Sequence, residues 1–531
     1  DKGVFIMSVF SNNLLLGAGG QSTGPEPFDP TLIPNSVWLD GTADFLSVAL
    51  GAKTRTKAVI GTWFQKTGFT TADSTIFSKR SGGTAEFGMR MQDQASKQGL
   101  ISIYDFDSAG SGQYAAESSG MVLRDIGWYH IMISIDTTAV AGSRLRYFIN
   151  GIDRTDTLTV SPDYALNDNP SITGGSGGET QWGIGSGGSS QFAPIYLAQS
   201  FMLDDDSIQN NDVGVPDILD TFTYGTNGSQ FVPKANADIA SLASSAGGDS
   251  FCLDYANSSD LGNDISSNNN DFSPTSMAAA NQRTNTPSKV FPIMNPLNDI
   301  ATVVLSEGNT RVNAQANASI RSTLFASAGK KYAEITVTAI GNSYLGVAIN
   351  GTNPTSFAAT GAVACQQGGD VYVSSSSPSG KKCPAYTTND VLGILIDVEA
   401  NKFWVSKNGT FHSMDRDPTI TLTATQVLAG TGGFDLTELG SDGSYGIHVG
   451  NSDGSAQNVS VNFGQASFSH TPPDGYVDWA SDNLAAPDFQ GKDFFDATLY
   501  EGNGTSQRVG DFVPFTDALA VANSAMFQHD D

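Results

Sequence analysis

The stretch DVLGILIDVEANKFWVSKNG, residues 390–409, carries the strongest folding signal of the chain. Apolar side chains stand at every second position from Leu392 to Ile396, which is the periodicity of a strand with one buried face. After a short polar turn the alternation resumes, and it ends at Asn408 and Gly409, which readily take the positive φ angles of a tight reversal. This pattern predicts a β-hairpin.

An earlier stretch, WYHIMISID at residues 128–136, has the same design. Its alternating apolar side chains are followed by a polar turn, and a return strand from Leu145 to Ile149 ends at Asn150 and Gly151. Two separated hairpins of one design predict two antiparallel β-sandwich domains of related architecture. We therefore expect an all-β fold.

The composition agrees with this fold class and excludes one class of partner. Charged residues make up 15% of the 531 residues, and Gly occupies 58 positions. Short strands joined by turns have this composition, whereas helical proteins need more Glu, Lys, Leu and Arg. The net charge is −27 and the sequence has no block of Lys or Arg, which argues against nucleic-acid binding.

The acidity has two interpretations. Like charges keep copies of a protein apart and soluble, and this is the simpler one. The alternative is that some carboxylates hold Ca²⁺; no other cofactor is expected.

The sequence contains three cysteines, Cys252, Cys365 and Cys383, without the C-x-x-C spacing of a zinc site. Cys365 and Cys383 flank a Gly/Ser-rich loop. Two free thiols are the expectation there, and a disulfide across the loop is the alternative. No run of about 18 apolar residues or basic leader is visible, so we expect a soluble protein with no membrane insertion and no signal peptide.

Composition divides the chain into five segments. We expect an extended Gly/Pro-rich arm, a first β-sandwich, an Asn/Ser/Gly-rich ordered connector, a second β-sandwich, and a C-terminal connector that begins a further repeat. Their boundaries are residues 1–35, 36–206, 207–300, 301–468 and 469–531.

The C-terminal segment echoes earlier parts of the chain. Residues 499–504 resemble residues 223–228, and residues 514–527 parallel residues 27–39 with a spacing that differs by one residue. This echo predicts that the natural polypeptide continues past Asp531.

The first β-rich segment resembles a known family. It contains Trp-Tyr-His-Ile at residues 128–131, an Arg-Tyr-Phe-Ile-Asn-Gly return at 146–151 and Ala-Gln-x-Phe-Met-Leu-Asp at 198–204. These motifs look like the laminin-G/pentraxin branch of concanavalin A-like domains. The segments Asn-Asn-Leu-Leu-Leu-Gly-Ala at 12–18 and Ser-Val-Trp-Leu-Asp-Gly-Thr at 36–42 look like the version found in bacteriophage virion proteins.

The second β-rich segment resembles the SPRY domain over most of its length and in the same order. The motifs are Tyr-x-Glu-Ile, Leu-Gly-Val-Ala, the organising hairpin and Val-Asn-Phe-Gly-Gln, at residues 332–335, 345–348, 390–409 and 461–465. The stretch at 262–272 is similar to a connector that follows laminin-G-like domains in phage proteins.

Acidic clusters are the first candidates for chemistry. Asp105 and Asp107 flank a predicted strand end, and glycan hydrolysis would need two carboxylates about 5 to 10 Å apart in a cleft. Metal ligation is a second possible use, but acidic turn residues at a sandwich rim are commoner than either. The run Asp204, Asp205 and Asp206 is expected to be a solvated turn. We assign no catalytic or metal-ligating residue.

Histidines and aromatic residues complete the candidates. None of the histidines has a Ser or Cys partner in a nucleophile motif, so structural roles are expected; they are His130, His412, His448, His470 and His529. Tyr104, Trp182 and Trp404 are possible platforms for a sugar ring. Aromatic residues in sandwiches are more often part of the core, so the binding residues remain unassigned.

Together the resemblances imply a non-enzymatic structural protein of a tailed-phage virion, either a tail fibre or a tail-associated adhesin on the particle exterior. Its expected partners are other virion subunits, further copies of itself, with a trimer as one arrangement, and a glycan or protein of the host surface. Two alternatives stay open: a purely architectural capsid-decorating protein and a polysaccharide depolymerase.

Overall fold

The computed structural model describes residues 32–483, except 52, 68–72, 82–83, 93–98, 107–111, 120–122, 124–126, 173–177, 186–190, 209–217, 223–233, 296–302, 316, 351–359, 375–377, 416, 441–442 and 453–454. The predicted further repeat, most of the predicted arm, Asp107 and His529 lie outside these residues.

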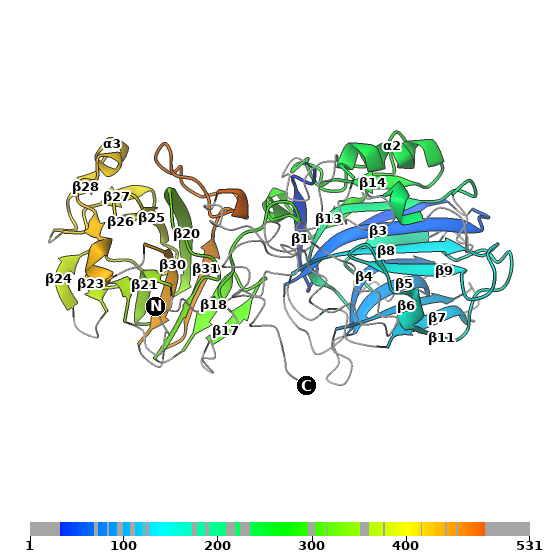
Figure 1. Ribbon diagram of the computed structural model, residues 1–531, viewed down its shortest axis with the longest axis horizontal. Coiled ribbons are helices and arrows are strands. Elements are labelled where there is room, and N and C mark those ends of the chain that lie inside the picture. Colours follow the sequence, from blue (N-terminus) through cyan, green and yellow to red (C-terminus); the bar gives the residue numbers. More distant parts are fainter. Residues whose placement is uncertain are drawn as a thin grey trace, which may run out of the picture.

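The first sandwich consists of two antiparallel sheets packed face to face (Figure 1). Sheet A has the strand order β10 (Ile152–Asp153), β9 (Leu145–Ile149), β8 (Trp128–Asp136), β3 (Lys57–Lys66), β13 (Pro194–Leu203), β1 (Ser36–Asp40) and β16 (Gln282–Arg283), with β14 (Phe251–Leu253) pairing β13. Sheet B has the order β11 (Leu158–Val160), β7 (Gly112–Ser118), β6 (Leu100–Phe106), β5 (Thr84–Gln92), β4 (Ser74–Ser81), β12 (Gly178–Trp182), β2 (Phe45–Leu50) and β15 (Ser273–Thr275).

Alternation along the strands fills the space between these sheets. Phe87, Met89 and Met91 point inward from β5, and Ile101 and Ile103 do so from β6; all five are buried. Period-two side chains on two facing sheets make one continuous core. The predicted all-β class with antiparallel sandwiches is confirmed.

Residues that were interpreted as connector complete the first sandwich. The stretch 236–283 contributes helix α2 (Asn236–Ala246) and strands β14, β15 and β16. The apolar anchors Phe251, Tyr255 and Phe272 are buried in the core between sheets A and B. Burial of these side chains draws the segment onto the sheets, so the stretch that joins the sandwiches is shorter than residues 207–300.

The second sandwich is built in the same way. Sheet C has the order β17 (Val303–Ser306), β18 (Arg311–Ala314), β31 (Gln457–Asn462), β20 (Lys330–Ala339), β25 (Val391–Asp397), β26 (Lys402–Lys407), β27 (Thr410–His412) and β28 (Thr421–Leu422), with β29 (Phe434–Asp435) pairing β26. Sheet D has the order β19 (Ala318–Arg321), β30 (Tyr445–Asn451), β21 (Ser343–Ile349), β22 (Ala362–Gln366), β23 (Asp370–Val373) and β24 (Pro378–Lys382).

The organising hairpin is the β25–β26 pair of sheet C, and its turn residues behave as predicted. Asn408 and Gly409 have φ angles of 48° and 81°. The short helices are η1 (Thr155–Thr157), η2 (Ile218–Thr221), η4 (Ala279–Asn281), α3 (Ala424–Leu428), η5 (Leu436–Leu439) and η6 (Ser481–Asn483). The structure has Cys252, Cys365 and Cys383 as buried free thiols, so Cys365 and Cys383 form no disulfide.

The stretch that joins the sandwiches is fastened to the first of them by buried hydrogen bonds. The side-chain amide of Asn285 donates to Gln65 Oε1 over 2.6 Å. The backbone carbonyl of Asn285 accepts from Ser36 Oγ, also over 2.6 Å. The second sandwich also contacts the first directly: Gly308, in the turn between β17 and β18, donates its backbone N–H to Thr67 O over 2.8 Å.

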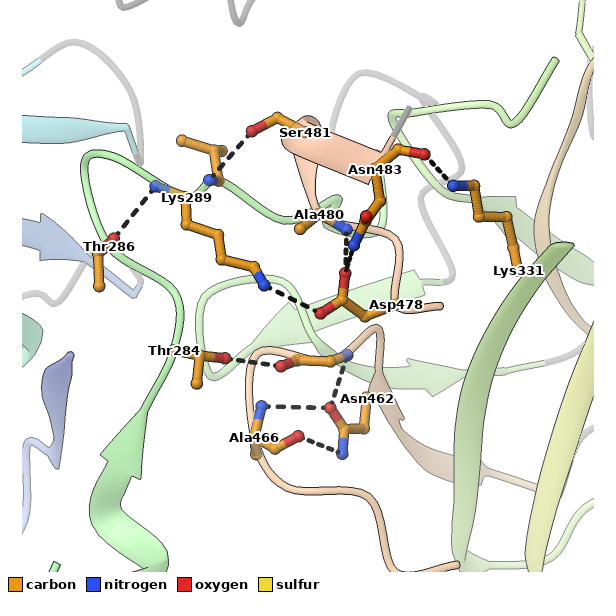
Figure 2. Close-up of polar contacts among 12 residues, drawn as sticks. Thr284, Thr286, Lys289, Lys331, Asn462, Ala466, Asp478, Ala480, Ser481 and Asn483 are labelled. Carbon is orange, nitrogen blue, oxygen red and sulfur yellow. Dashed lines mark hydrogen bonds and ion pairs between the residues drawn. The ribbon is translucent and has the colours of Figure 1, made fainter. Parts of the chain in front are cut away.

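The same stretch is held from the other side by residues 464–483, which follow the last strand (Figure 2). Lys289 Nζ lies 3.1 Å from Asp478 Oδ2, and the N–H of Ser481 donates to Val290 O over 2.8 Å. Thr284 Oγ1 donates to Gly464 O over 2.7 Å. Residues 284–290, which we call the strap, are therefore hydrogen-bonded both to the first sandwich and to the segment that follows the second.

Candidate functional site

The two outer faces of the first sandwich differ in what covers them. The outer face of sheet A is apolar and lies under α2, on the side away from sheet B (Figure 1). Its buried cluster joins strand residues to the covering segments and comprises Val59, Met132, Phe148, Phe201, Leu203, Ile218, Leu219, Phe222, Ile239, Ala240, Ala243 and Cys252.

No described element covers the outer face of sheet B, which bears a groove of about 740 Å³. A row of cross-strand neighbours crosses its floor: Arg90 on β5 pairs with Ser102 on β6, Ser102 with Glu117 on β7, and Glu117 with Thr159 on β11. With strands about 4.8 Å apart, this row is roughly 14 Å long. This row makes a polar stripe across the floor of the groove, and the stripe is longer than one side chain.

Tyr104 and Gly88 set the shape of the floor beside this row. They are direct partners on β6 and β5, and a Cβ at Gly88 would lie 2.2 Å from the Tyr104 ring. Glycine therefore lets the ring lie flat across β5. The guanidinium carbon of Arg90 sits 5.2 Å from the centre of that ring, within the range of a cation–π contact.

Arg90 is held in place by two further groups. Its Nε donates to Ser102 Oγ over 2.8 Å, and Nη1 lies 3.6 Å from Asp73 Oδ2. The side chain stays 30% exposed, at the groove. Because three neighbours fix the guanidinium, it is a positioned donor, and little entropy is lost when it binds.

Gln92, which lines the same groove, carries a buried hydrogen-bond acceptor. Its Nε2 donates to Glu117 Oε2 over 2.9 Å, and a carboxylate only accepts, so this contact settles the orientation of the amide. Oε1 then faces away from Glu117, and it has no hydrogen-bond partner among the described residues. Since buried polar atoms are normally paired, Gln92 needs a donor that a bound molecule or water would supply.

Gln191 closes one side of the groove in a strained conformation. Its φ is 61°, uncommon for a residue other than glycine. Thr75 holds it in that state by donating its backbone N–H to Gln191 O over 3.0 Å. Strain of this kind collects at functional sites.

The aromatic platforms predicted from the sequence are not available. Trp182 and Trp404 have no exposed surface: the first lies in the core between sheets A and B, and the second is covered on the outer side of sheet C. Tyr104 does line the groove, but it is only 8% exposed because Arg90 lies over its ring. Its role is to support Arg90.

Asp105 faces the core, so it cannot serve a catalytic pair at the rim. Its side chain has no exposed surface and accepts from Tyr164 Oη over 2.7 Å and from the N–H of Ser171 over 3.0 Å. Burial raises the pKa of this carboxyl to about 7, and the hydrogen bonds oppose that shift. Its proposed partner, Asp107, lies outside the described residues.

The prediction of a solvated turn at residues 204–206 is wrong for its first member. Asp204, which directly follows β13, is 1% exposed, and burial together with the nearby charge of Asp249 raises its pKa to about 7. Asp206 is exposed and accepts from the N–H of Thr56 over 2.7 Å. In the described part of the chain, no group of three or more His, Cys, Asp or Glu side chains could hold a metal ion.

The described histidines lie apart from the groove. His130 and His448 are buried in β8 and β30, and burial lowers the pKa of His130 to about 3. His412 Nδ1 lies 2.9 Å from Pro418 O, and the backbone N–H of His470 donates to Glu334 Oε1. Among the residues that the structure covers, no helix is both long enough and apolar enough to span a bilayer.

No family model matches the sequence, and no curated protein matches it. Among solved structures, the chain is similar to a native heptameric SAP-like pentraxin from Limulus polyphemus, with 14% identity, a TM-score of 0.25, and coverage of 33% of this chain and 77% of the pentraxin. The SPRY domain of human HERC1 shares 11% identity at a TM-score of 0.24, with coverage of 32% and 96%. These similarities say nothing about function.

Proposed function

We propose that this protein is a non-enzymatic adhesive and structural component of a tailed-phage virion, whose first sandwich binds a saccharide of the host surface in the groove of sheet B. The observation that carries the binding role is the polar row from Arg90 to Thr159, open on a face that no other described element covers. The virion setting rests on the sequence resemblance at residues 12–18, 36–42 and 262–272.

The groove supports binding better than hydrolysis. Cleavage of a glycosidic bond requires a pair of carboxylates on either side of the bond. Glu117 is the one carboxylate among the described residues that line the groove. A purely architectural role is also less favoured, because it leaves the acceptor of Gln92 and the strain at Gln191 without a use.

Two glycine substitutions test the proposal on the full chain. Gly88→Ala pushes the Tyr104 ring, and with it Arg90, out of place, whereas a Cβ at Gly112 meets Phe106 at 3.6 Å, an ordinary contact. In a glycan array followed by calorimetry, we expect the parent and Gly112→Ala to bind alike and Gly88→Ala to lose at least about tenfold in affinity. Equal binding by Gly88→Ala would place the site elsewhere.

Two further measurements separate the alternatives. New reducing ends after incubation with host polysaccharide would establish a depolymerase instead. Mass spectrometry of purified phage particles tests the virion setting, and absence of the chain from particles would remove that part of the proposal.

A further inference from the structure

The charges of the groove bear on which saccharides it accepts. Arg90 and Glu117 are the charged side chains among its described lining residues, and Asp73 stands beside Arg90. One cation is thus matched against two carboxylates. The chain as a whole carries a net charge of −27, which adds a repulsive field for any anion that approaches.

The geometry of Arg90 also disfavours an anionic ligand. Guanidinium recognises a carboxylate best when two parallel N–H groups meet its two oxygens. Here Nε is taken by Ser102 and Nη1 faces Asp73. The Nε edge of the guanidinium is therefore not free to meet both oxygens of a carboxylate, and Nη1 is shared with Asp73. The N–H groups that remain also suit single neutral acceptors such as a hydroxyl or an amide carbonyl.

The acceptors of the groove require a ligand that donates. Gln92 Oε1 lacks a donor among the described residues, and the Glu117 carboxylate can only accept. Sugar hydroxyls and acetamido N–H groups supply donors, whereas a uronate carboxylate brings only further acceptors. Acceptors opposed to acceptors leave buried polar groups unpaired, which is costly.

Apolar lining completes the match. Leu100, Phe106 and Ala115 lie on the same floor and are partly exposed. They offer a surface for the C–H side of a pyranose ring. Apolar side chains therefore flank the polar row, and a neutral sugar likewise offers both C–H and O–H groups.

From these observations, and resting on the proposed saccharide binding, we infer that the groove takes neutral saccharide units bearing hydroxyl or acetamido groups and rejects acidic ones. Affinity for a uronate oligomer is expected to be lower by about ten- to hundredfold, the effect of one or two unpaired buried groups. Binding of the neutral ligand should change little with salt, because no ion pair forms.

The experiment uses calorimetry on the full chain at low and high NaCl, with glucose and N-acetylglucosamine oligomers as neutral probes and oligogalacturonate as the acidic one. Support is neutral binding that is insensitive to salt, with oligogalacturonate at least about tenfold weaker. Glu117→Gln should narrow the gap between the two classes, and Gly112→Ala should leave it unchanged.

Two results overturn the inference, and they are distinguishable. Oligogalacturonate binding as tightly as the neutral probes removes the charge selection but keeps the saccharide site. Binding of neither class, by a chain shown to be folded from its cooperative unfolding, removes the proposed function and the inference with it.

Discussion

The two outer faces of the first sandwich differ in what covers them, although side chains alternate between inward and outward positions on the strands of both sheets. On sheet A the outward side chains are apolar, and the chain covers them with α2. On sheet B they include Arg90, Ser102 and Glu117, and the described residues leave them facing a groove. An apolar face gains stability when it is covered, whereas a fixed polar face that stays open can recognise a ligand.

The largest expected effect comes from the covered face. Ile239 lies on the buried side of α2, has no exposed surface and packs against sheet A. Ile239→Ala should lower the free energy of unfolding by about 2–5 kcal/mol, since a cavity replaces the side chain. Urea unfolding measures this, with Ser241→Ala on the exposed side of the same helix as control, expected within about 0.5 kcal/mol. If both substitutions changed the free energy of unfolding equally little, α2 would not stabilise the protein by covering sheet A.

The next effect concerns Asp105, on the inner side of the strand that carries Tyr104. The pKa of its carboxyl rises from 3.8 to about 7, so the folded state binds a proton more tightly than the unfolded state. This contribution to stability is present at low pH and is lost as the pH rises through about 7.

We therefore expect this group to lower the free energy of unfolding by about 2–3 kcal/mol between pH 5 and pH 8. Asp105→Asn should lack that part of the decline, while Asp204, which also has a raised pKa, keeps its own part. Urea titrations at the two pH values measure the difference. Parallel pH profiles for parent and variant would contradict a raised pKa at Asp105.

The junction between the sandwiches is an intermediate case, because it is covered but polar. Asp478 accepts from Lys289 Nζ and from the N–H of Ala480 (Figure 2). Asp478→Ala should cost about 1–2 kcal/mol through the donors left unpaired. Limited proteolysis should then cut near residues 478–483 sooner than in the parent; an unchanged digestion rate would show that the strap does not depend on this carboxylate.

The smallest effect on stability is expected at the open face. Arg90→Ala removes an ion pair at 3.6 Å with a side chain that is 30% exposed, and such pairs contribute under about 1 kcal/mol. Saccharide affinity should nevertheless fall, and measuring both quantities on one variant separates recognition from folding. A loss of stability as large as that of Ile239→Ala would abolish the contrast between the two faces.

Local patterns predicted the strands well. The hairpins at residues 128–149 and 391–407 appear as the β8–β9 and β25–β26 pairs, and the turn residues have the positive φ angles that the sequence indicated. Alternation also separates Trp404 from the neighbours that fill the core between sheets C and D. It does not reveal that other segments cover its outer face as well, where Trp404 donates to Thr431 O over 2.8 Å.

The groove was missed because it depends on register between strands. Alternation on β5 puts Phe87, Met89 and Met91 on one side and Arg90 on the other. A single sequence does not say that Arg90 stands opposite Ser102, because strand pairing is a tertiary property. Helix α2 was missed for a related reason: its Ala- and Ser-rich sequence shows the helical spacing of Ile239 and Ala243 only faintly.

The strap at the junction affects how the protein would carry mechanical tension. Within the described residues, the second sandwich is entered at Thr284–Val290 and left at Asp478–Asn483, and these two stretches are bonded to each other. A pull between the first sandwich and Asn483 therefore loads the contacts Lys289–Asp478 and Val290–Ser481. Strand β20 of sheet C shares this load, because Lys331 Nζ donates to Asn483 O and the N–H of Tyr332 donates to Val477 O over 2.9 Å. The tension is thus divided between the junction and one strand of the second sandwich.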